Sequence, residues 1–298
     1  MQYNTLKRSG LKISNVSFGC MSLHANSSDN ESIISKAIDE GITLFDTADI
    51  YDKGNNEKLL GNALRGKRNE VLISTKVGNQ LRADGNGWDW NPGKDYILKA
   101  IDESLMRLQT DHIDLYLLHG GTIEDPIDEV IEAFERLIES GKIRAYGISS
   151  IRPNVIRDYV AKSNIAAVMT QYSYLDRRPE EATLSLLHEN EIGILARGTL
   201  ASGLLVDKPA KEYLGLSEKE VRNIVAEFQA DLPQGKGHAD AAIRYVIDNP
   251  AITTAVVGVR TMQQLESALA ATHQSPLSVE ELQEMHAKGN VNFYADHR

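Results

Sequence analysis

Four side chains that can exchange or steer protons follow short apolar runs of this sequence: Asp46, Tyr51, Lys76 and His119. Tyrosine is a poor acid near neutral pH, with an unperturbed pKa of about 10. A lysine ammonium about 4 Å away would stabilise the phenolate by up to ~4 kcal/mol at an effective dielectric constant of ~20. A carboxylate beside the lysine would keep it charged in a dry cleft, and a histidine N–H would orient a carbonyl group. The four residue types together predict a proton-donating site.

The same residues also admit purely structural explanations. Asp46 and Lys76 could form an ion pair without chemical function, Tyr51 could be a packed ring, and a single histidine at a strand end often has no chemical role. Convergence of all four on one rim would favour catalysis. We predict no metal, because the other strand ends supply no third carboxylate or histidine ligand. We predict no acyl transfer, because the chain lacks a Gly-x-Ser-x-Gly motif.

The elements that must position these residues alternate along the chain. Short apolar runs typical of buried strands cover 16–20, 42–45, 71–75, 113–118, 143–148, 166–170, 192–196 and 252–257. Helical patterns cover 30–40, 56–64, 94–108, 127–140, 153–162, 179–190, 237–248 and 261–272. These strand–helix units predict an α/β protein with a parallel sheet closed into a single (β/α)8 TIM barrel.

An open doubly wound sheet is the alternative, but no Gly-x-Gly-x-x-Gly motif follows the first strand. We expect one barrel domain over residues 1–298. Residues 7–13 predict two short strands around Ser9-Gly10, a hairpin that would plug one end of the barrel. A further helix is expected at 278–286, followed by a loosely ordered end.

The link after the seventh strand, 201–236, is unusually long and contains a predicted helix at 217–231. A connection of this length is often a lid or a binding element. A tolerated surface insertion is the alternative.

The composition argues against two classes of binding partner, nucleic acids and membranes. The 298 residues carry a formal net charge of −10 without a long basic block, so we expect no binding to nucleic acid. No apolar run reaches the ~18 residues that span a bilayer, so no membrane partner is expected. A single cysteine and an N-terminus without an apolar signal core predict a cytoplasmic protein. The sequence does not indicate the oligomeric state.

Three separated segments resemble the hallmark motifs of the aldo-keto reductases. They are Phe45–Tyr51 (FDTADIY), Ser74–Lys76 (STK) and Ile113–His119 (IDLYLLH). The resemblance extends in the expected order from about residue 6 to residue 271, nearly the whole chain. It implies a (β/α)8 barrel that reduces carbonyl compounds.

The resemblance also implies a role for each of the four residues. Tyr51 would be the general acid, and Lys76 would make its proton easier to release. Asp46 would hold Lys76, and His119 would orient the substrate carbonyl.

Because side chains cannot donate hydride, the same resemblance implies a nicotinamide cofactor. Ser149 and Gln171 match positions that hydrogen-bond the carboxamide, and Ser150 stands where the family usually has asparagine. Arg197 stands where many relatives stack an aromatic ring on the nicotinamide, and a guanidinium can stack as well. The end of the first strand would line the cleft through Gly19, Cys20 and Met21. We expect Cys20 to be a packing residue, because no basic residue adjoins it.

Two segments resemble phosphate-binding parts of the family. In the first, Gly198 and Gly203 would let the backbone approach the pyrophosphate, and Ser202 would add a donor beside Leu200. The second opens the eighth helix and comprises Gly258, Arg260, Thr261 and Gln264. A helix N-terminus with an adjacent arginine suits the adenosine 2′-phosphate, which favours NADPH over NADH. Thr261 would also cap this helix.

These observations predict an NADPH-dependent reduction of an aldehyde or ketone, a small-molecule carbonyl substrate. Ile50, Trp88 and Trp90 would form an apolar wall of the pocket, together with Met21 and the 201–236 link. One alternative is a barrel that binds a nicotinamide cofactor to sense redox state, with little turnover. The other is an aldolase that uses Lys76 as a Schiff base.

Overall fold

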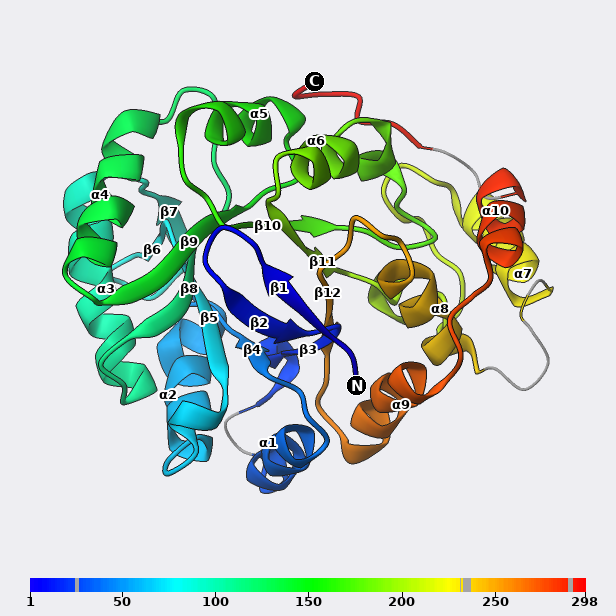
Figure 1. Ribbon diagram of the computed structural model, residues 1–298, viewed down its shortest axis with the longest axis horizontal. Coiled ribbons are helices and arrows are strands. Elements are labelled where there is room, and N and C mark those ends of the chain that lie inside the picture. Colours follow the sequence, from blue (N-terminus) through cyan, green and yellow to red (C-terminus); the bar gives the residue numbers. More distant parts are fainter. Residues whose placement is uncertain (25–26, 231, 233–236, 289–291) are drawn as a thin grey trace.

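The computed structural model describes residues 1–24, 27–230, 232, 237–288 and 292–298. Eight parallel strands form a closed barrel in the order β10-β11-β12-β3-β4-β5-β8-β9 (Figure 1). The strands are β3 (Val16–Gly19), β4 (Leu44–Asp46), β5 (Leu72–Val77), β8 (Ile113–Leu118), β9 (Ile143–Ser149), β10 (Ala167–Gln171), β11 (Gly193–Arg197) and β12 (Thr254–Gly258). The predicted barrel and its eight strands are confirmed.

Helices follow the barrel strands and surround them (Figure 1). They are α1 (Asn30–Asp39), α2 (Asn55–Ala63), α3 (Lys94–Leu108), α4 (Ile127–Glu139), α5 (Pro153–Lys162), α6 (Thr183–Glu189), α8 (His238–Ile247) and α9 (Met262–His273). The expected sixth helix, 179–190, is shorter. A 3-10 turn at Arg178–Glu181 precedes α6, and Ala182 between them has a non-helical φ of −155°, which breaks the helix.

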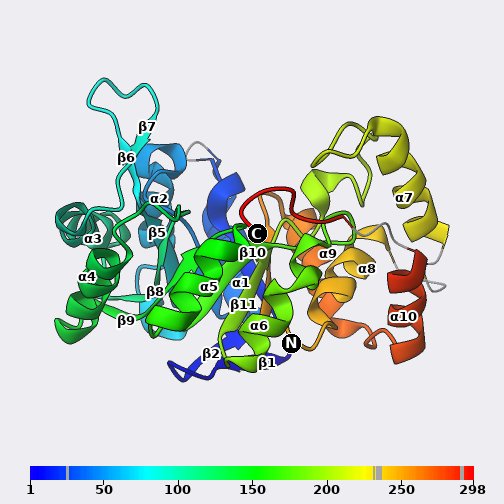
Figure 2. The same ribbon diagram turned by 90° about the horizontal axis from the view of Figure 1, so that it is seen from above.

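The N-terminal hairpin closes the lower end of the barrel (Figure 2). Its strands are β1 (Tyr3–Leu6) and β2 (Leu11–Ser14), so residues 7–10 form the turn and not strand, contrary to the expected boundaries. Leu6, Leu11 and Ile13 pack inside the barrel with residues such as Leu115 and Leu117. The predicted plug is confirmed.

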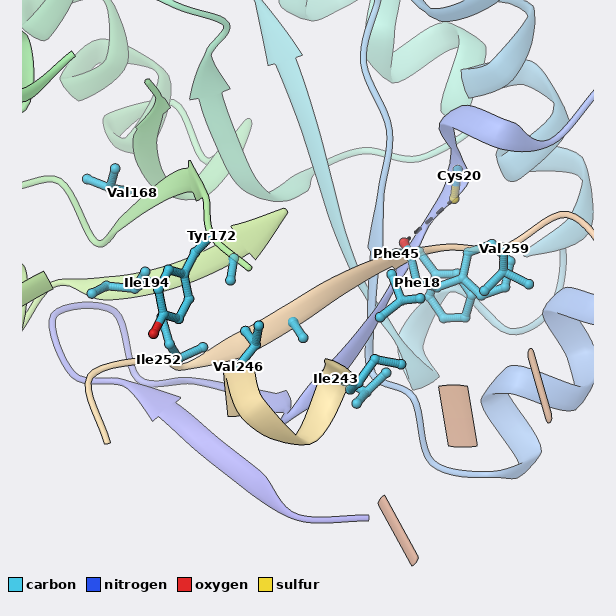
Figure 3. Packing of buried hydrophobic residues seen from close by; sticks show 14 of the residues in the cluster. Phe18, Cys20, Phe45, Val168, Tyr172, Ile194, Ile243, Val246, Ile252 and Val259 are labelled. Carbon is cyan, nitrogen blue, oxygen red and sulfur yellow. Dashed lines mark hydrogen bonds between the residues drawn. The ribbon is translucent and has the colours of Figure 1, made fainter. Parts of the chain in front are cut away.

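A second apolar layer lies between the barrel and the helices. Barrel strands contribute Phe18, Phe45 and Val168, and α8 contributes Ile243 and Val246 (Figure 3). Because helices cover the outer face while side chains fill the inside, the strands are buried on both faces. This burial explains why they are continuous apolar runs in the sequence.

Two connections extend from the upper end of the barrel, where the strands end (Figure 2). After β5, the chain forms an antiparallel hairpin of β6 (Asn79–Leu81) and β7 (Trp88–Trp90). After β11, the long link contains a 3-10 turn at Ala201–Gly203 and α7 (Glu218–Ala230). Residues 231 and 233–236 of the predicted link, and residue 231 of its predicted helix, lie outside the described part of the chain.

The C-terminal segment includes the expected helix, α10 (Val279–Lys288). Residues 292–298 then run past α6 towards α5 (Figure 1), where the His297 carbonyl accepts from Asn154 N, and Tyr294 is buried beneath the Arg178 guanidinium. The expectation of a loosely ordered end stays a prediction, and residues 289–291 of that end lie outside the described part of the chain.

Candidate active site

The ends of β4 and β5 form a buried ion pair. Lys76 Nζ donates to Asp46 Oδ2 at 2.7 Å and to the Thr47 carbonyl at 2.7 Å. The Lys76 and Asp46 side chains are 1% and 6% exposed. Asp46 pairs with Ser74 across the β4–β5 ladder, which brings the two charged groups to the same level of the barrel.

Tyr51 adjoins this pair. Lys76 Nζ lies 3.5 Å from the Tyr51 hydroxyl oxygen and 5.0 Å from the centre of its ring. Burial alone lowers the pKa of Lys76, but the Asp46 carboxylate and the Tyr51 side chain oppose this, and the net pKa lies above its usual value. Lys76 is therefore an ammonium that faces a phenol, and this ammonium stabilises negative charge on the phenol oxygen.

His119 completes the group from β8. Its backbone N–H donates to the Val77 carbonyl at 2.7 Å, and its ring meets the Tyr51 ring edge-on at 5.8 Å. Burial, followed by the charges of Lys76 and Arg197, lowers the pKa of His119 to about 3. His119 is thus a neutral imidazole, and its buried Nδ1 has no hydrogen-bond partner within the described residues. The structure brings all four predicted residues together at the upper rim.

The backbone that follows Tyr51 is strained. Asp52, Lys53 and Gly54 have φ values of 46°, 54° and 85°, three consecutive left-handed residues. For non-glycine residues this conformation costs roughly 1–2 kcal/mol each, and such strain persists where surrounding contacts enforce it. The turn sets the direction of Tyr51 relative to α2.

Asp49, two residues before Tyr51 in the chain, carries another buried carboxyl. Asp49 is 7% exposed, its Oδ1 has no hydrogen-bond partner among described residues, and it lines a cavity of about 240 Å³ with Tyr96 and Arg107. Burial, reinforced by the negative charge of Glu57 and opposed by Arg107, raises the pKa of Asp49 to about 8. A neutral carboxyl is therefore expected at pH 7.

Another hollow, of about 600 Å³, lies elsewhere in the protein. It lies at the C-terminal end of α3 beside Arg68 and Met106, where the segments that lead into β5 and β8 meet. This is the end of the barrel opposite the four residues, so this hollow has no part in their chemistry.

The ends of β10 and β11 form a hydrogen-bonded chain. Arg197 Nη1 donates to Gln171 Oε1 at 2.9 Å, and Gln171 Nε2 donates to the Tyr213 hydroxyl at 3.0 Å. Tyr213 belongs to the long link after β11, which thus folds back over the strand ends. Tyr213 was not predicted from the sequence, because its partner Gln171 is 42 positions away and no local pattern marks the contact.

The segment after β11 has a backbone suited to an anion. Gly198, Ala201, Ser202 and Gly203 have φ values of 73°, 47°, 59° and 92°, and the last three are consecutive. Successive N–H groups in such turns form concave anion-binding sites. Lys208 Nζ donates to the Ser202 carbonyl at 2.8 Å and adds positive charge beside the turn.

The start of α9 is capped from both sides. Thr261 Oγ1 accepts from Gln264 N at 3.2 Å, and Gln264 Oε1 accepts from Arg260 N at 3.0 Å. Thr261 is the N-cap, as expected. Gly258 ends β12 beside β3, and the Arg260 side chain is exposed.

The residues at the end of β3 that were predicted to line the cofactor cleft differ in exposure. Gly19 ends β3, Cys20 is fully buried, and Met21 is 63% exposed. Burial raises the pKa of the Cys20 thiol, whose Sγ donates to the Phe18 carbonyl at 4.0 Å (Figure 3). The thiol is a packing group, as expected.

Ser149 and Ser150 lie at and just after the end of β9, and both are buried. The Ser150 hydroxyl accepts from Arg152 N at 3.1 Å, so part of its hydrogen-bonding capacity is used locally.

The three residues predicted to form an apolar wall of the substrate pocket have different surroundings in the structure. Trp90 is partly buried and donates from Nε1 to Asp125 Oδ1 at 2.9 Å, which ties the β6–β7 hairpin to the loop after β8. Trp88 is 56% exposed on β7, and Ile50 directly precedes Tyr51. Ile50 therefore adjoins the four residues along the chain, while Trp90 covers the neighbouring strand ends at Gly78 and Gly120.

The described residues form neither a metal centre nor a membrane-spanning helix. No group of three or more His, Cys, Asp or Glu residues there could hold a metal ion. Among the helices in that part of the chain, none is long and apolar enough to cross a membrane.

Comparison with known proteins gives consistent matches. The model of the aldo/keto reductase family matches residues 15–290. The chain is 43% identical to the uncharacterized oxidoreductase YqkF of Bacillus subtilis over 307 aligned positions, which cover all of both proteins. It is 31% identical to the aldo-keto reductase YhdN of the same organism, over 90% of this chain and 87% of the relative.

Solved structures of an aldo-keto reductase also match this chain. The holo form of the aldo-keto reductase AKR11C1 from Bacillus halodurans matches with a TM-score of 0.94 and 42% identity, over 100% of this chain and 99% of that one. Its apo form matches with a TM-score of 0.85 and 37% identity over the same shares.

The chain therefore belongs to the aldo/keto reductase family, and the predicted resemblance is confirmed. It is an NAD(P)H-dependent oxidoreductase that uses a nicotinamide cofactor.

Proposed function

We propose that this protein reduces an aldehyde or ketone to the alcohol with NADPH, and that Tyr51 donates the proton. The observation that carries this proposal is the contact of the Lys76 ammonium with the Tyr51 hydroxyl oxygen, at 3.5 Å, in a group from which water is largely excluded. A phenol beside a fixed, buried cation is suited to release a proton to a neighbouring oxygen.

Each of the four residues has a distinct part in this proposal. Lys76 stabilises the charge that remains on Tyr51 after proton transfer, and Asp46 with the Thr47 carbonyl fixes the direction of the ammonium. His119 is neutral, so it can donate one N–H to the substrate carbonyl without carrying charge. The bound nicotinamide supplies the hydride.

The cofactor-binding residues form two groups in the proposal. Near the nicotinamide we place Gly19, Cys20, Met21, Ser149, Ser150, Gln171 and Arg197. Along the phosphates we place Gly198, Leu200, Ser202, Gly203, Gly258, Arg260, Thr261 and Gln264. The left-handed turn at 201–203 fits a pyrophosphate, because its N–H groups lie on consecutive residues.

The preference for NADPH rests on Arg260. Its exposed guanidinium adjoins the N-terminus of α9, and this helix end attracts negative charge. A 2′-phosphate present in NADPH and absent from NADH would bind there.

We further propose that Ile50, Trp88 and Trp90 border the substrate pocket and that the 201–236 link acts as a lid. We infer a single domain over residues 1–298 and a cytoplasmic location, which the acidic charge and lone buried cysteine support.

The aldolase alternative is disfavoured, because a Schiff-base lysine must lose its proton, and Asp46 raises the pKa of Lys76.

The test is a cofactor and substrate panel. The purified protein is mixed with NADPH or NADH and with aromatic and aliphatic aldehydes and ketones, and cofactor oxidation is followed by absorbance. We expect carbonyl-dependent oxidation of NADPH, with a higher kcat/KM than for NADH. An Arg260→Ala variant should lose that preference. Borohydride trapping of a substrate on Lys76, or tight NADPH binding without turnover, would contradict the proposal.

A further inference from the structure

The strained turn after Tyr51 is held from one side by α3. Arg107 packs against Gly54, where an added Cβ would lie 2.9 Å from Arg107 Cδ and 3.1 Å from its Nε. Gly54 is the last of the three left-handed residues. The left-handed backbone favours glycine at this position, and the close packing places Arg107 directly against the turn.

Arg107 is itself fixed by a buried carboxylate of α2. Its Nε donates to Glu57 Oε2 at 2.6 Å, and its Nη2 donates to the Ser104 hydroxyl at 3.1 Å. The Glu57 side chain is fully buried, whereas that of Arg107 is 19% exposed. Glu57 lies three residues beyond Gly54 in the chain. Arg107 therefore contacts both the end of the strained turn and the helix that follows it.

The other oxygen of Glu57 reaches the strand that carries Lys76. Thr75 Oγ1 donates to Glu57 Oε1 at 2.6 Å, and both groups are buried. Thr75 directly precedes Lys76 on β5. One carboxylate thus connects the segment that carries Tyr51 with the segment that carries Lys76.

We propose that Glu57 and Arg107 are positioning residues that set the separation between the Tyr51 hydroxyl and Lys76 Nζ. This inference rests on the proposed function, in which that contact promotes proton donation. The contact measures 3.5 Å, at the outer edge of hydrogen-bond range, so a displacement of less than 1 Å would break it. Misplacement on this scale lowers catalytic rates by up to ~100-fold.

The chain offers a matched control pair. Arg68 donates to Asp114 at 2.7 Å, with side chains 17% and 1% exposed, nearly the same burial as Arg107 and Glu57. It lies before β5, at the end of the barrel opposite Tyr51. Arg107→Lys and Arg68→Lys each keep the positive charge and lose the guanidinium geometry. Because Arg68 donates to four groups and Arg107 to two, Arg68→Lys should lower the melting temperature at least as much.

The test compares crystal structures and kinetics of these two variants. In Arg107→Lys we expect the distance from Tyr51 Oη to Lys76 Nζ to exceed about 4 Å. We expect kcat to fall about tenfold or more, with the Kd for NADPH and the KM for the carbonyl compound changed less than about threefold. Arg68→Lys should keep the wild-type distance and kcat.

A second comparison does not depend on the arginine. Thr75→Val removes the donor to Glu57 at nearly constant volume, whereas Thr75→Ser keeps it. We expect Thr75→Val to lower kcat and Thr75→Ser to keep kcat close to the wild-type value.

Two outcomes would overturn the proposal: an unchanged Tyr51–Lys76 distance in both Arg107→Lys and Thr75→Val, or an equal fall in kcat for Arg107→Lys and Arg68→Lys. The distance is measured without turnover. If the wild-type protein reduced no carbonyl compound, the proposed function would fail, and the structures would still decide whether Glu57 and Arg107 set this distance.

Discussion

Lys76 Nζ lies between the Asp46 carboxylate, at 2.7 Å, and the Tyr51 hydroxyl oxygen, at 3.5 Å. The cation is therefore held by one acidic group and directed at another. Because its side chain is 1% exposed, water does little to screen either interaction. This arrangement underlies both the chemistry and the local stability of the rim.

Removal of the Asp46 carboxylate should lower both the catalytic rate and the stability of the protein. In Asp46→Asn the buried Lys76 ammonium loses its counterion, and breaking a buried ion pair in this way costs about 3–5 kcal/mol. We expect a lower free energy of unfolding in urea and a large loss of kcat. Asp89→Asn, which breaks the exposed Arg82–Asp89 pair, should change stability by no more than about 1 kcal/mol. Similar losses in both variants would contradict the account.

His119 should not titrate in the working range of the enzyme. Its pKa of about 3 lies below the unfolded value of about 6.5, so the neutral ring stabilises the folded state above pH 6.5, and this contribution is lost as the pH falls towards 3. We expect no inflection in kcat near pH 6.5. The stability advantage of wild type over His119→Gln should shrink from pH 6.5 to 3. An inflection near pH 6.5 that disappears in His119→Gln would show that this reasoning is wrong.

Asp49 should have the opposite effect on stability. Its folded pKa of about 8 exceeds the unfolded value of about 3.9, so its contribution is fully present below pH 3.9 and is lost as the pH rises towards 8. Asp49→Asn keeps the shape and removes the titration. Relative to wild type, its free energy of unfolding should rise with pH across this window, by at most about 1.4 kcal/mol per pH unit. A pH-independent difference would contradict the prediction.

Tyr213 should affect cofactor binding through Gln171. Its hydroxyl accepts from Gln171 Nε2, which orients the amide proposed to bind the nicotinamide. Loss of one such hydrogen bond costs about 0.5–1.5 kcal/mol, so Tyr213→Phe should weaken NADPH binding by roughly 2- to 10-fold. Fluorescence titration measures this. Tyr146→Phe, which loses a bond to Glu135 between α4 and β9, is the control and should bind NADPH normally. Tighter binding by Tyr213→Phe would show that Tyr213 competes with the cofactor.

The sequence predicted the barrel and the four rim residues because both depend on local patterns. Strands buried on both faces are continuous apolar runs, and in a parallel barrel their ends meet at one rim. Asp46, Lys76 and His119 each follow such a run, so their meeting could be inferred before any coordinates.

Other features depend on contacts that no local pattern marks. Asp52 and Gly54 are residue types that turns favour, but nothing in the sequence marks Lys53 for a left-handed backbone, so the strain in this turn was not expected. Glu57 and Arg107 are charged residues on helices and suggest a solvated surface, but α2 and α3 face each other there. The β6–β7 hairpin lacks the alternating apolar pattern of a strand, because much of it is exposed.

The most direct measurement is the turnover of Tyr51→Phe with a good carbonyl substrate, together with its affinity for NADPH. This change removes one oxygen atom and leaves the ring against His119. The account predicts a loss of kcat of at least about 100-fold, with NADPH bound as tightly as in the wild type. Turnover of Tyr51→Phe at the wild-type rate would contradict the claim that Tyr51 donates the proton.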